Sequence, residues 1–168
     1  MKTTHLIVAS VAMALCGYVA AKPYLTIDAI KTGFINNDSV KLSEHIDYPL
    51  LRQNLKDQIS TTMMQQAAES SKDNPMATFA TGIATMMVDK VIESMITPGG
   101  MASIISGKSK DDNDKPDHQQ MFKNARFAYD SIDHFSVWIP VKDSNDARLV
   151  LQRDGIDWKL VNIIIPQI

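Results

Sequence analysis

Few residue patterns in this chain have the types and spacing that chemistry requires. Gly107-Lys108-Ser109 ends like a phosphate-binding loop, but that motif needs a glycine at position 102, which is Ala102. The acidic stretch that follows lacks the turn glycine and the closing glutamate of a helix-flanked calcium loop. We therefore interpret its aspartates as a solvated loop and predict no metal and no cofactor. These aspartates are Asp111, Asp112, Asp114 and Asp117.

One short segment could support acid–base chemistry. Asp130, Asp133 and His134 lie close together, and a carboxylate beside an imidazole can move protons. No serine or cysteine stands in a recognisable nucleophile elbow, and His45 and His118 are too distant in sequence for a helical metal pair. We interpret the three residues as surface groups at the start of a strand. An enzyme with a small pocket that uses them is the alternative hypothesis.

Methionine is the unusual feature of the composition, with ten in 168 residues. Thioethers bind Cu(I), but these methionines form no tight Met-x-x-Met clusters and no histidine or cysteine accompanies them. Methionine also fills irregular cores and forms adaptable apolar surfaces, and both interpretations remain open. The candidate apolar binding surface, for a partner protein or a lipid, consists of Met63, Met64, Met76, Met86, Met87 and Met95.

The start of the chain is typical of a bacterial export signal. Met1-Lys2 precedes an uncharged apolar run from Leu6 to Ala21, which ends in the small residues Val19-Ala20-Ala21. This run of 16 residues is at the lower limit for crossing a hydrocarbon core of about 30 Å. The segment 1–21 is thus a signal peptide or a single membrane anchor. We predict that residues 22–168 are periplasmic, either free or anchored to the inner membrane.

The exported part, 22–168, has 16 basic and 19 acidic residues, a net charge of −3. That balance excludes a nucleic-acid partner, which requires clustered basic residues. The only cysteine, Cys16, lies within the signal, so no disulfide can stabilise the exported part. Leu15 before it disfavours lipid attachment, since that position takes a small residue.

Helical patterns fill the first half of the exported part. Thr26 is placed as the N-cap of a helix that ends at Asn36-Asn37, and Asp38 or Ser39 starts a short second helix. A third begins near Pro49, reaches about Glu69 and carries the apolar stripe Leu51, Leu55, Ile59 and Met63. The segment 75–106 is helical and apolar almost all round, which is typical of a buried helix. A charged, flexible loop is expected over 107–120.

The second half alternates with the period of a strand. Strands are expected over Ala125–Val141, Ala147–Gln152 and Ile156–Ile165, with Asp154-Gly155 as a hairpin turn. The last strand is too apolar to be an open edge. Helices first and strands last predict one α+β domain, with an antiparallel meander packed on the helices. The residues expected inside are Phe135, Val137, Ile139, Leu149, Leu151, Trp158 and Leu160, with Trp138 also expected as a core aromatic.

Both ends of the exported part carry motifs that belong together, namely Pro23-Tyr24-Leu25-Thr26, Ile46-Asp47-Tyr48-Pro49, Leu51-Arg52, Arg153-Asp154-Gly155 and Trp158-Lys159-Leu160. In these motifs the chain resembles one uncharacterised bacterial family, the domain of unknown function DUF2939. The family implies no activity. More loosely, the helical front and the final hairpin resemble the NTF2-like/cystatin-like α+β fold, from which the apolar segment 75–106 departs. We therefore expect an exported envelope domain that binds a partner protein or an apolar ligand and is not an enzyme.

Overall fold

The structure is a computed structural model, and it describes residues 2–70, 88–101, 122–141 and 145–164. Helices α1 (Lys2–Asn36), α2 (Ser39–His45) and α3 (Tyr48–Ser70) precede strands β1 (Arg126–Tyr129), β2 (His134–Ile139), β3 (Ala147–Asp154) and β4 (Asp157–Ile164). Residues 88–95 and 98–101 are also helical. The α+β class is confirmed. The loop 107–120 and most of the apolar segment 75–106 lie outside the described residues.

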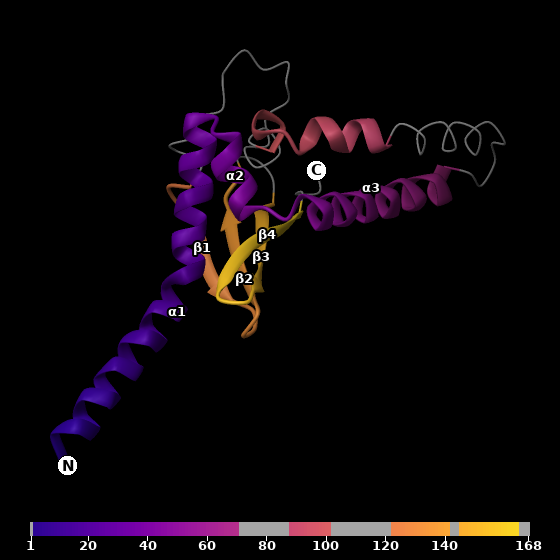
Figure 1. The fold of residues 1–168 in the computed structure, drawn as a ribbon. Helices are drawn as coiled ribbons and strands as arrows, with labels where there is room; N and C mark the ends of the chain where they lie inside the picture. Colours follow the sequence, from indigo (N-terminus) through magenta and orange to yellow (C-terminus); the bar gives the residue numbers. More distant parts are fainter. Residues whose placement is uncertain (1, 71–87, 102–121, 142–144, 165–168) are drawn as a thin grey trace.

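Helix α1 is continuous across the predicted boundary between signal and domain (Figure 1). The placement of Thr26 as an N-cap is wrong, because the helix begins at Lys2 and Thr26 lies buried within it. A capping side chain starts a helix only where the preceding chain is not already helical. Pro23 is accommodated inside the helix, although proline removes one backbone hydrogen bond.

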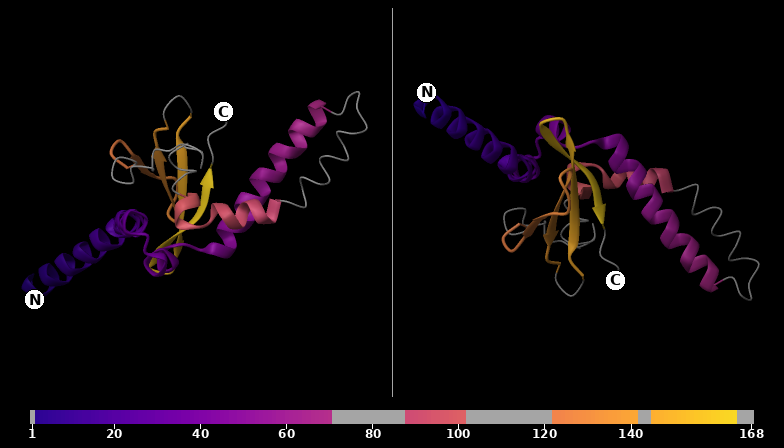
Figure 2. Two further views of the ribbon diagram at one scale, coloured as in Figure 1. Left: turned by 90° about the horizontal axis from the view of Figure 1, so that it is seen from above. Right: turned by 90° about the horizontal axis from the view of Figure 1, so that it is seen from below.

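The two halves of α1 have different surroundings. In the N-terminal half, apolar side chains point into solvent, and more than half of each is exposed: Ile7, Val11, Met13, Leu15 and Tyr18. In the C-terminal half, Ile27, Ile30 and Phe34 are buried in the core. Helix α1 therefore projects from the domain at one end and forms part of its core at the other, as Figure 2 shows from two sides.

The predicted starting positions of the other two helices are confirmed. Asn37 has a left-handed φ of 51°, which ends α1, and the Asp38 carboxylate then accepts a hydrogen bond from the Lys41 amide at 3.0 Å. The Asp47 carboxylate accepts one from the Leu50 amide at 3.0 Å and so caps α3. Polar side chains thus fix where both helices begin.

The sheet is an antiparallel meander in the order β1-β2-β3-β4. The single strand expected over Ala125–Val141 is wrong, since residues 130–133 form a turn that divides it into β1 and β2. The β3–β4 hairpin turns through Gly155, whose φ of +63° suits the first central residue of a two-residue turn. Ile156, expected to begin the last strand, lies in that turn and is 65% exposed.

One face of the sheet forms the core with the helices. Apart from Trp138, every strand residue predicted to lie in the core is buried, including Trp158 at 2% exposure. The expectation for Trp138 is wrong: it is half-buried on the outer face, and the guanidinium carbons of Arg126 and Arg148 lie 5.9 and 5.1 Å from its ring centroid. Alternation explains this, because neighbouring strand residues point to opposite faces and Val137 and Ile139 point inward.

The last strand, β4, is an edge strand of this sheet, and helix α3 and the segment before it cover that edge. The Asp47 amide donates to the Leu160 carbonyl at 3.0 Å, and the Asn54 side-chain amide donates to the Val161 carbonyl at 2.8 Å. One turn further along α3, Gln58 donates to the Ile163 carbonyl at 3.2 Å. The expectation that this strand is not an open edge is therefore confirmed.

Candidate functional site: a pocket between the N-terminal helix and the sheet

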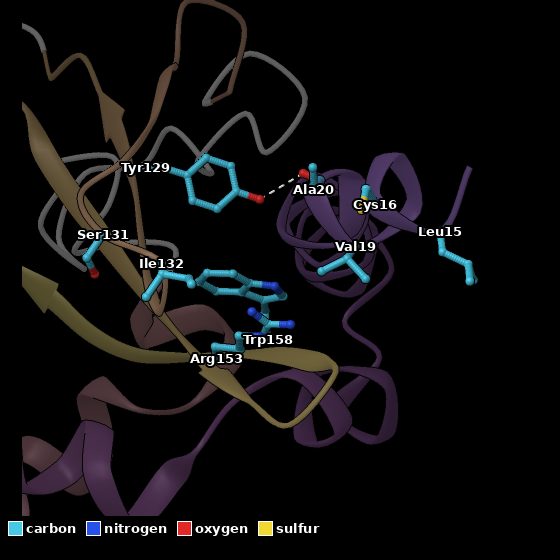
Figure 3. Close-up of a pocket in the computed structure, with 9 residues that line it drawn as sticks. All are labelled: Leu15, Cys16, Val19, Ala20, Tyr129, Ser131, Ile132, Arg153 and Trp158. Atoms are coloured by element: carbon cyan, nitrogen blue, oxygen red, sulfur yellow. Dashed lines mark hydrogen bonds between the residues drawn. The ribbon is translucent and has the colours of Figure 1, made fainter. Parts of the chain in front are cut away.

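A pocket of about 570 Å³ lies between the projecting half of α1 and the end of the sheet that carries the β1–β2 turn (Figure 3). We call it the α1 pocket. Its walls are mainly apolar, and they come from three places far apart in the sequence. The lining residues are Leu15, Cys16, Val19 and Ala20 from α1, Tyr129, Ser131 and Ile132 from β1 and its turn, and Arg153 and Trp158 from the β3–β4 hairpin.

Aromatic rings form the sheet side of the α1 pocket. The rings of Tyr129 and Trp158 meet edge to face, with centroids 5.8 Å apart, and both pack on Phe135. The Tyr129 hydroxyl donates to the Ala20 carbonyl at 2.8 Å and so attaches the sheet to α1. Burial raises the pKa of the Tyr129 phenol, which therefore remains a neutral donor at physiological pH.

The pocket also contains donor groups that could hold a ligand. The Trp158 indole nitrogen is buried and has no hydrogen-bond partner among the described residues. An unpaired buried donor costs about 1–3 kcal/mol. In Figure 3 the indole nitrogen and the Arg153 guanidinium both lie on the side of the pocket that faces α1. The Arg153 Nε donates to the Gly155 carbonyl at 2.9 Å, and the remaining guanidinium donors could pair with an acceptor group of a ligand whose other part contacts the apolar walls.

An ion pair holds α1 to the sheet beside the pocket. The Lys22 ammonium lies 2.7 Å from the Asp157 carboxylate, and it also lies 5.2 Å from the centroid of the Tyr18 ring. The hydrogen bond from Lys22 holds the pKa of Asp157 below its usual range. This contact and the Tyr129 contact lie on either side of the peptide bond after Ala21.

The structure places none of the three predicted acid–base residues in the α1 pocket. Asp130 accepts hydrogen bonds from Ser136 and from Arg148, the latter at 2.7 Å, on the outer side of the sheet. Burial alone would raise the Asp130 pKa, but these two hydrogen bonds outweigh it and lower the pKa. Asp130 thus secures the β1–β2 turn to β3.

Ser131, Asp133 and His134 do meet, but not in the geometry of a catalytic triad. The Ser131 hydroxyl and the Asp133 carboxylate both contact Nδ1 of His134, at 3.3 and 3.0 Å. In a triad the serine and the carboxylate occupy opposite ring nitrogens, so that a proton can pass between them. Ser131 instead donates to Asp133 at 2.6 Å and, with His134, lowers the Asp133 pKa. The group stabilises the turn.

The predicted methionine surface is only partly within the described residues. Met63 and Met95 are half-buried, and Met64 is 71% exposed on α3. Met76, Met86 and Met87 lie outside the described residues. Met101, which was not among the candidates, is fully buried in the core. The surface therefore stays a prediction. Within the residues described, no group of three or more histidine, cysteine, aspartate or glutamate side chains could hold a metal ion.

Sequence reasoning missed the α1 pocket because it assigned the first 21 residues to a segment outside the domain. Four of the lining residues come from that segment. A detectable indication was the spacing of Leu15 and Val19, which are four residues apart and therefore share the helix face that borders the pocket. Their partners, Ile132 and Arg153, carried no pattern that marks a pocket.

The fold and the pocket define an α+β domain whose sheet packs against a long N-terminal apolar helix. By length and composition, Ala9–Asn36 within α1 is the one described helix that could cross a membrane. The family model for proteins of unknown function DUF2939 matches residues 12–104, more than half of the chain. The chain belongs to this family, which confirms the resemblance. No curated protein and no solved structure matches it.

Proposed function

We propose that this protein is an envelope domain that α1 anchors in the inner membrane, with residues 22–168 facing the periplasm. The exposed apolar half of α1 supports an anchor, since Ile7, Val11 and Met13 are each more than half exposed. Retention of the anchor is supported by the contacts on either side of Ala21. In the folded protein this peptide bond lies inside a helix between two attachments to the sheet, so α1 is an integral part of the domain.

The N-terminal mass of the protein tests retention. After cell fractionation, we expect membranes to hold a protein whose intact mass includes residues 1–21. A mass that begins at Lys22 would refute the anchor, and recovery of the intact chain from the cytosol would refute export.

The proposed activity is binding rather than catalysis, and its proposed ligand is apolar. The α1 pocket carries this proposal: its volume of about 570 Å³ lies within the range for small-molecule sites, and its walls are apolar with a few donors. A protein partner on the methionine surface remains a second proposal, which the 71% exposure of Met64 favours. Neither proposal involves a cofactor. The enzyme alternative gains no support from the pocket, because Asp130, Asp133 and His134 do not line it.

Quenching of Trp158 fluorescence by a spin-labelled stearic acid tests the pocket. In a Trp138→Phe background Trp158 is the only tryptophan, and a ligand in the pocket should quench it saturably. Val19→Phe fills the pocket and should abolish the saturable quenching. Val40→Phe is the matched control, because Val40 is 72% exposed on α2 and does not line the pocket. Equal quenching in the two variants would refute a ligand in the pocket.

We also propose a distant relation to the NTF2-like fold. Its support is the order of elements, in which helices precede an antiparallel sheet and cover one face of it. This likeness concerns the fold alone and adds nothing to the functional proposal.

A further inference from the structure

Two contacts establish how β1 lies along α1. Near the start of β1, Phe127 packs on Tyr24, with ring centroids 5.7 Å apart, and two residues later Tyr129 reaches the carbonyl of Ala20. Two strand residues advance by about 6.6 Å. The four helix residues from Tyr24 back to Ala20 span about 6 Å. The two elements therefore run in opposite directions, and two residues of β1 cover about the same distance as four residues of α1. Strand β1 thus leads toward the N-terminal end of α1.

The turn after β1 must then lie beside a still earlier part of α1. Ser131 and Ile132 line the α1 pocket together with Leu15, Cys16 and Val19 of the helix. Ile132 is the most exposed large apolar residue on the sheet, at 81%. This turn thus places an uncovered isoleucine next to the helix segment that the proposed function assigns to the membrane.

The length of the anchor decides how deep this turn lies. The apolar run Leu6–Ala21 spans about 24 Å as a helix, already less than the hydrocarbon core of about 30 Å. If Leu15–Ala21 stayed above the bilayer, Leu6–Ala14 would span only about 14 Å, roughly half of that core. The anchor can cross the bilayer only if the α1 residues that line the pocket are part of the membrane-embedded segment.

The residues around Lys22 also indicate where along α1 the membrane surface lies. Tyrosine and lysine are typical of the boundary between lipid and water, where an aromatic ring lies among headgroups and the ammonium reaches outward. Tyr18 and Lys22 are one helical turn apart, and the ammonium lies over the ring. A boundary at these residues places Leu15 and Cys16, and the turn that faces them, below the headgroup surface.

We propose that the β1–β2 turn, with Ile132 at its tip, is a membrane-contacting surface, and that acyl chains of the surrounding bilayer fill the α1 pocket. This inference rests on the proposed anchoring and specifies the apolar ligand as membrane lipid. The domain would then lie against the bilayer, with one end of its sheet in the interfacial layer.

The charges beside Ile132 fix how far the turn enters. Asp130 pairs with Arg148, and Asp133 is hydrogen-bonded to Ser131 and His134, so both carboxylates have partners. Their charges still favour the hydrated headgroup layer over the hydrocarbon, where a carboxylate is costly. The insertion is therefore limited to the depth of the Ile132 side chain. The β3–β4 turn lies beside Lys22, through the ion pair with Asp157, and is therefore nearer to the water than the β1–β2 turn.

Depth-dependent fluorescence quenching tests this placement in the full chain, reconstituted in phosphatidylcholine nanodiscs. In a Cys16→Ala background, an environment-sensitive dye is attached at Ile132→Cys, at Val11→Cys in the anchor, or at Val40→Cys on α2. Val40 is the matched control, because it is a similarly exposed aliphatic residue beyond the far end of α1. The quenchers are phosphatidylcholine spin-labelled near its headgroup, phosphatidylcholine spin-labelled near its chain ends, and iodide in water.

We expect the headgroup-proximal lipid quencher to quench the dye at position 132 several-fold more than the dye at position 40. Iodide should show the opposite order, and the dye at position 11 should respond to the chain-end quencher. If position 11 is in lipid but position 132 resembles position 40, the membrane-contacting turn is refuted while the anchor stands. If position 11 is also open to iodide, the anchor itself is refuted, and the turn proposal with it.

Discussion

Replacement of Trp158 tests the packing of the sheet most directly. Its side chain is 2% exposed and makes edge contacts with Phe135 and Tyr129. Emptying a buried aromatic site costs about 3–5 kcal/mol. We expect Trp158→Ala to lower the free energy of unfolding by about that amount, because a cavity would open where α1 meets the sheet.

Trp158→Phe should behave very differently, because the indole N–H has no partner among the described residues. Phenylalanine loses ring atoms equivalent to about two methylenes, or about 1.6 kcal/mol of burial. It also removes an unpaired buried donor, which costs about 1–3 kcal/mol. The two terms nearly cancel, so Trp158→Phe should change stability by less than about 1.5 kcal/mol.

Urea unfolding of the full chain in detergent micelles measures both changes, from the midpoint and the slope. Trp138→Ala is the matched control. Trp138 is half-buried on the outer face between Arg126 and Arg148, where two cation–π contacts are worth about 1–2 kcal/mol together. A Trp158→Ala change below about 1 kcal/mol would mean that Trp158 is exposed. The β4 register would then be off by one residue, and the reasoning refuted.

Three further predictions concern the supports of the fold. Asn54→Ala should cost about 1–2 kcal/mol in urea unfolding, because a β4 carbonyl loses its partner; the exposed Gln53→Ala should cost much less, and equal costs would contradict the edge cover. Gly33→Ala should lower Tm despite the better helix propensity of alanine, since its Cβ would lie 2.8 Å from side-chain atoms of the fully buried Leu42; a raised Tm would contradict this. The lowered pKa of Asp130 means that the unfolded chain takes up this proton first as pH falls. Its contribution is present above about pH 4 and is lost at lower pH, so Asp130→Asn should weaken the loss of stability between about pH 5 and 2, and an unchanged pH profile would contradict the role of its hydrogen bonds.

Periodicity predicted the parts of the fold in which one face is buried. Leu51 and Leu55 lie fully buried where the stripe on the third helix indicated, and Leu149 and Leu151 face the core as their alternation requires. In these segments the hydrophobic pattern and the burial have the same physical cause, the removal of apolar area from water. The hairpin at Gly155 was predictable for a local reason, because its positive φ favours glycine.

The wrong predictions arose where one local sequence pattern is compatible with two structures. Residues 125–141 were expected to form one strand because apolar residues alternate on both sides of residues 130–133. Alternation does not show that these four residues form a turn, in which Ile132 is 81% exposed. Thr26 has the chemistry of an N-cap, but an upstream helix already occupied that position. The α1 pocket was beyond reach for another reason, since it depends on how a supposed signal segment packs on strands more than a hundred residues away.

The contacts that hold α1 and α3 to the sheet also order events during biogenesis. Lys22 bonds to Asp157 across 135 positions, Asn54 to Val161 across 107, and Ala20 to Tyr129 across 109. Such non-local contacts slow folding, because the chain must close long loops before any contact repays the entropy. The contacts of Lys22 and Asn54 form only when β4, which ends at Ile164, has been synthesised. A translocation channel requires an unfolded chain, so for the export that we propose this topology would leave these contacts unformed until nearly the whole chain is available.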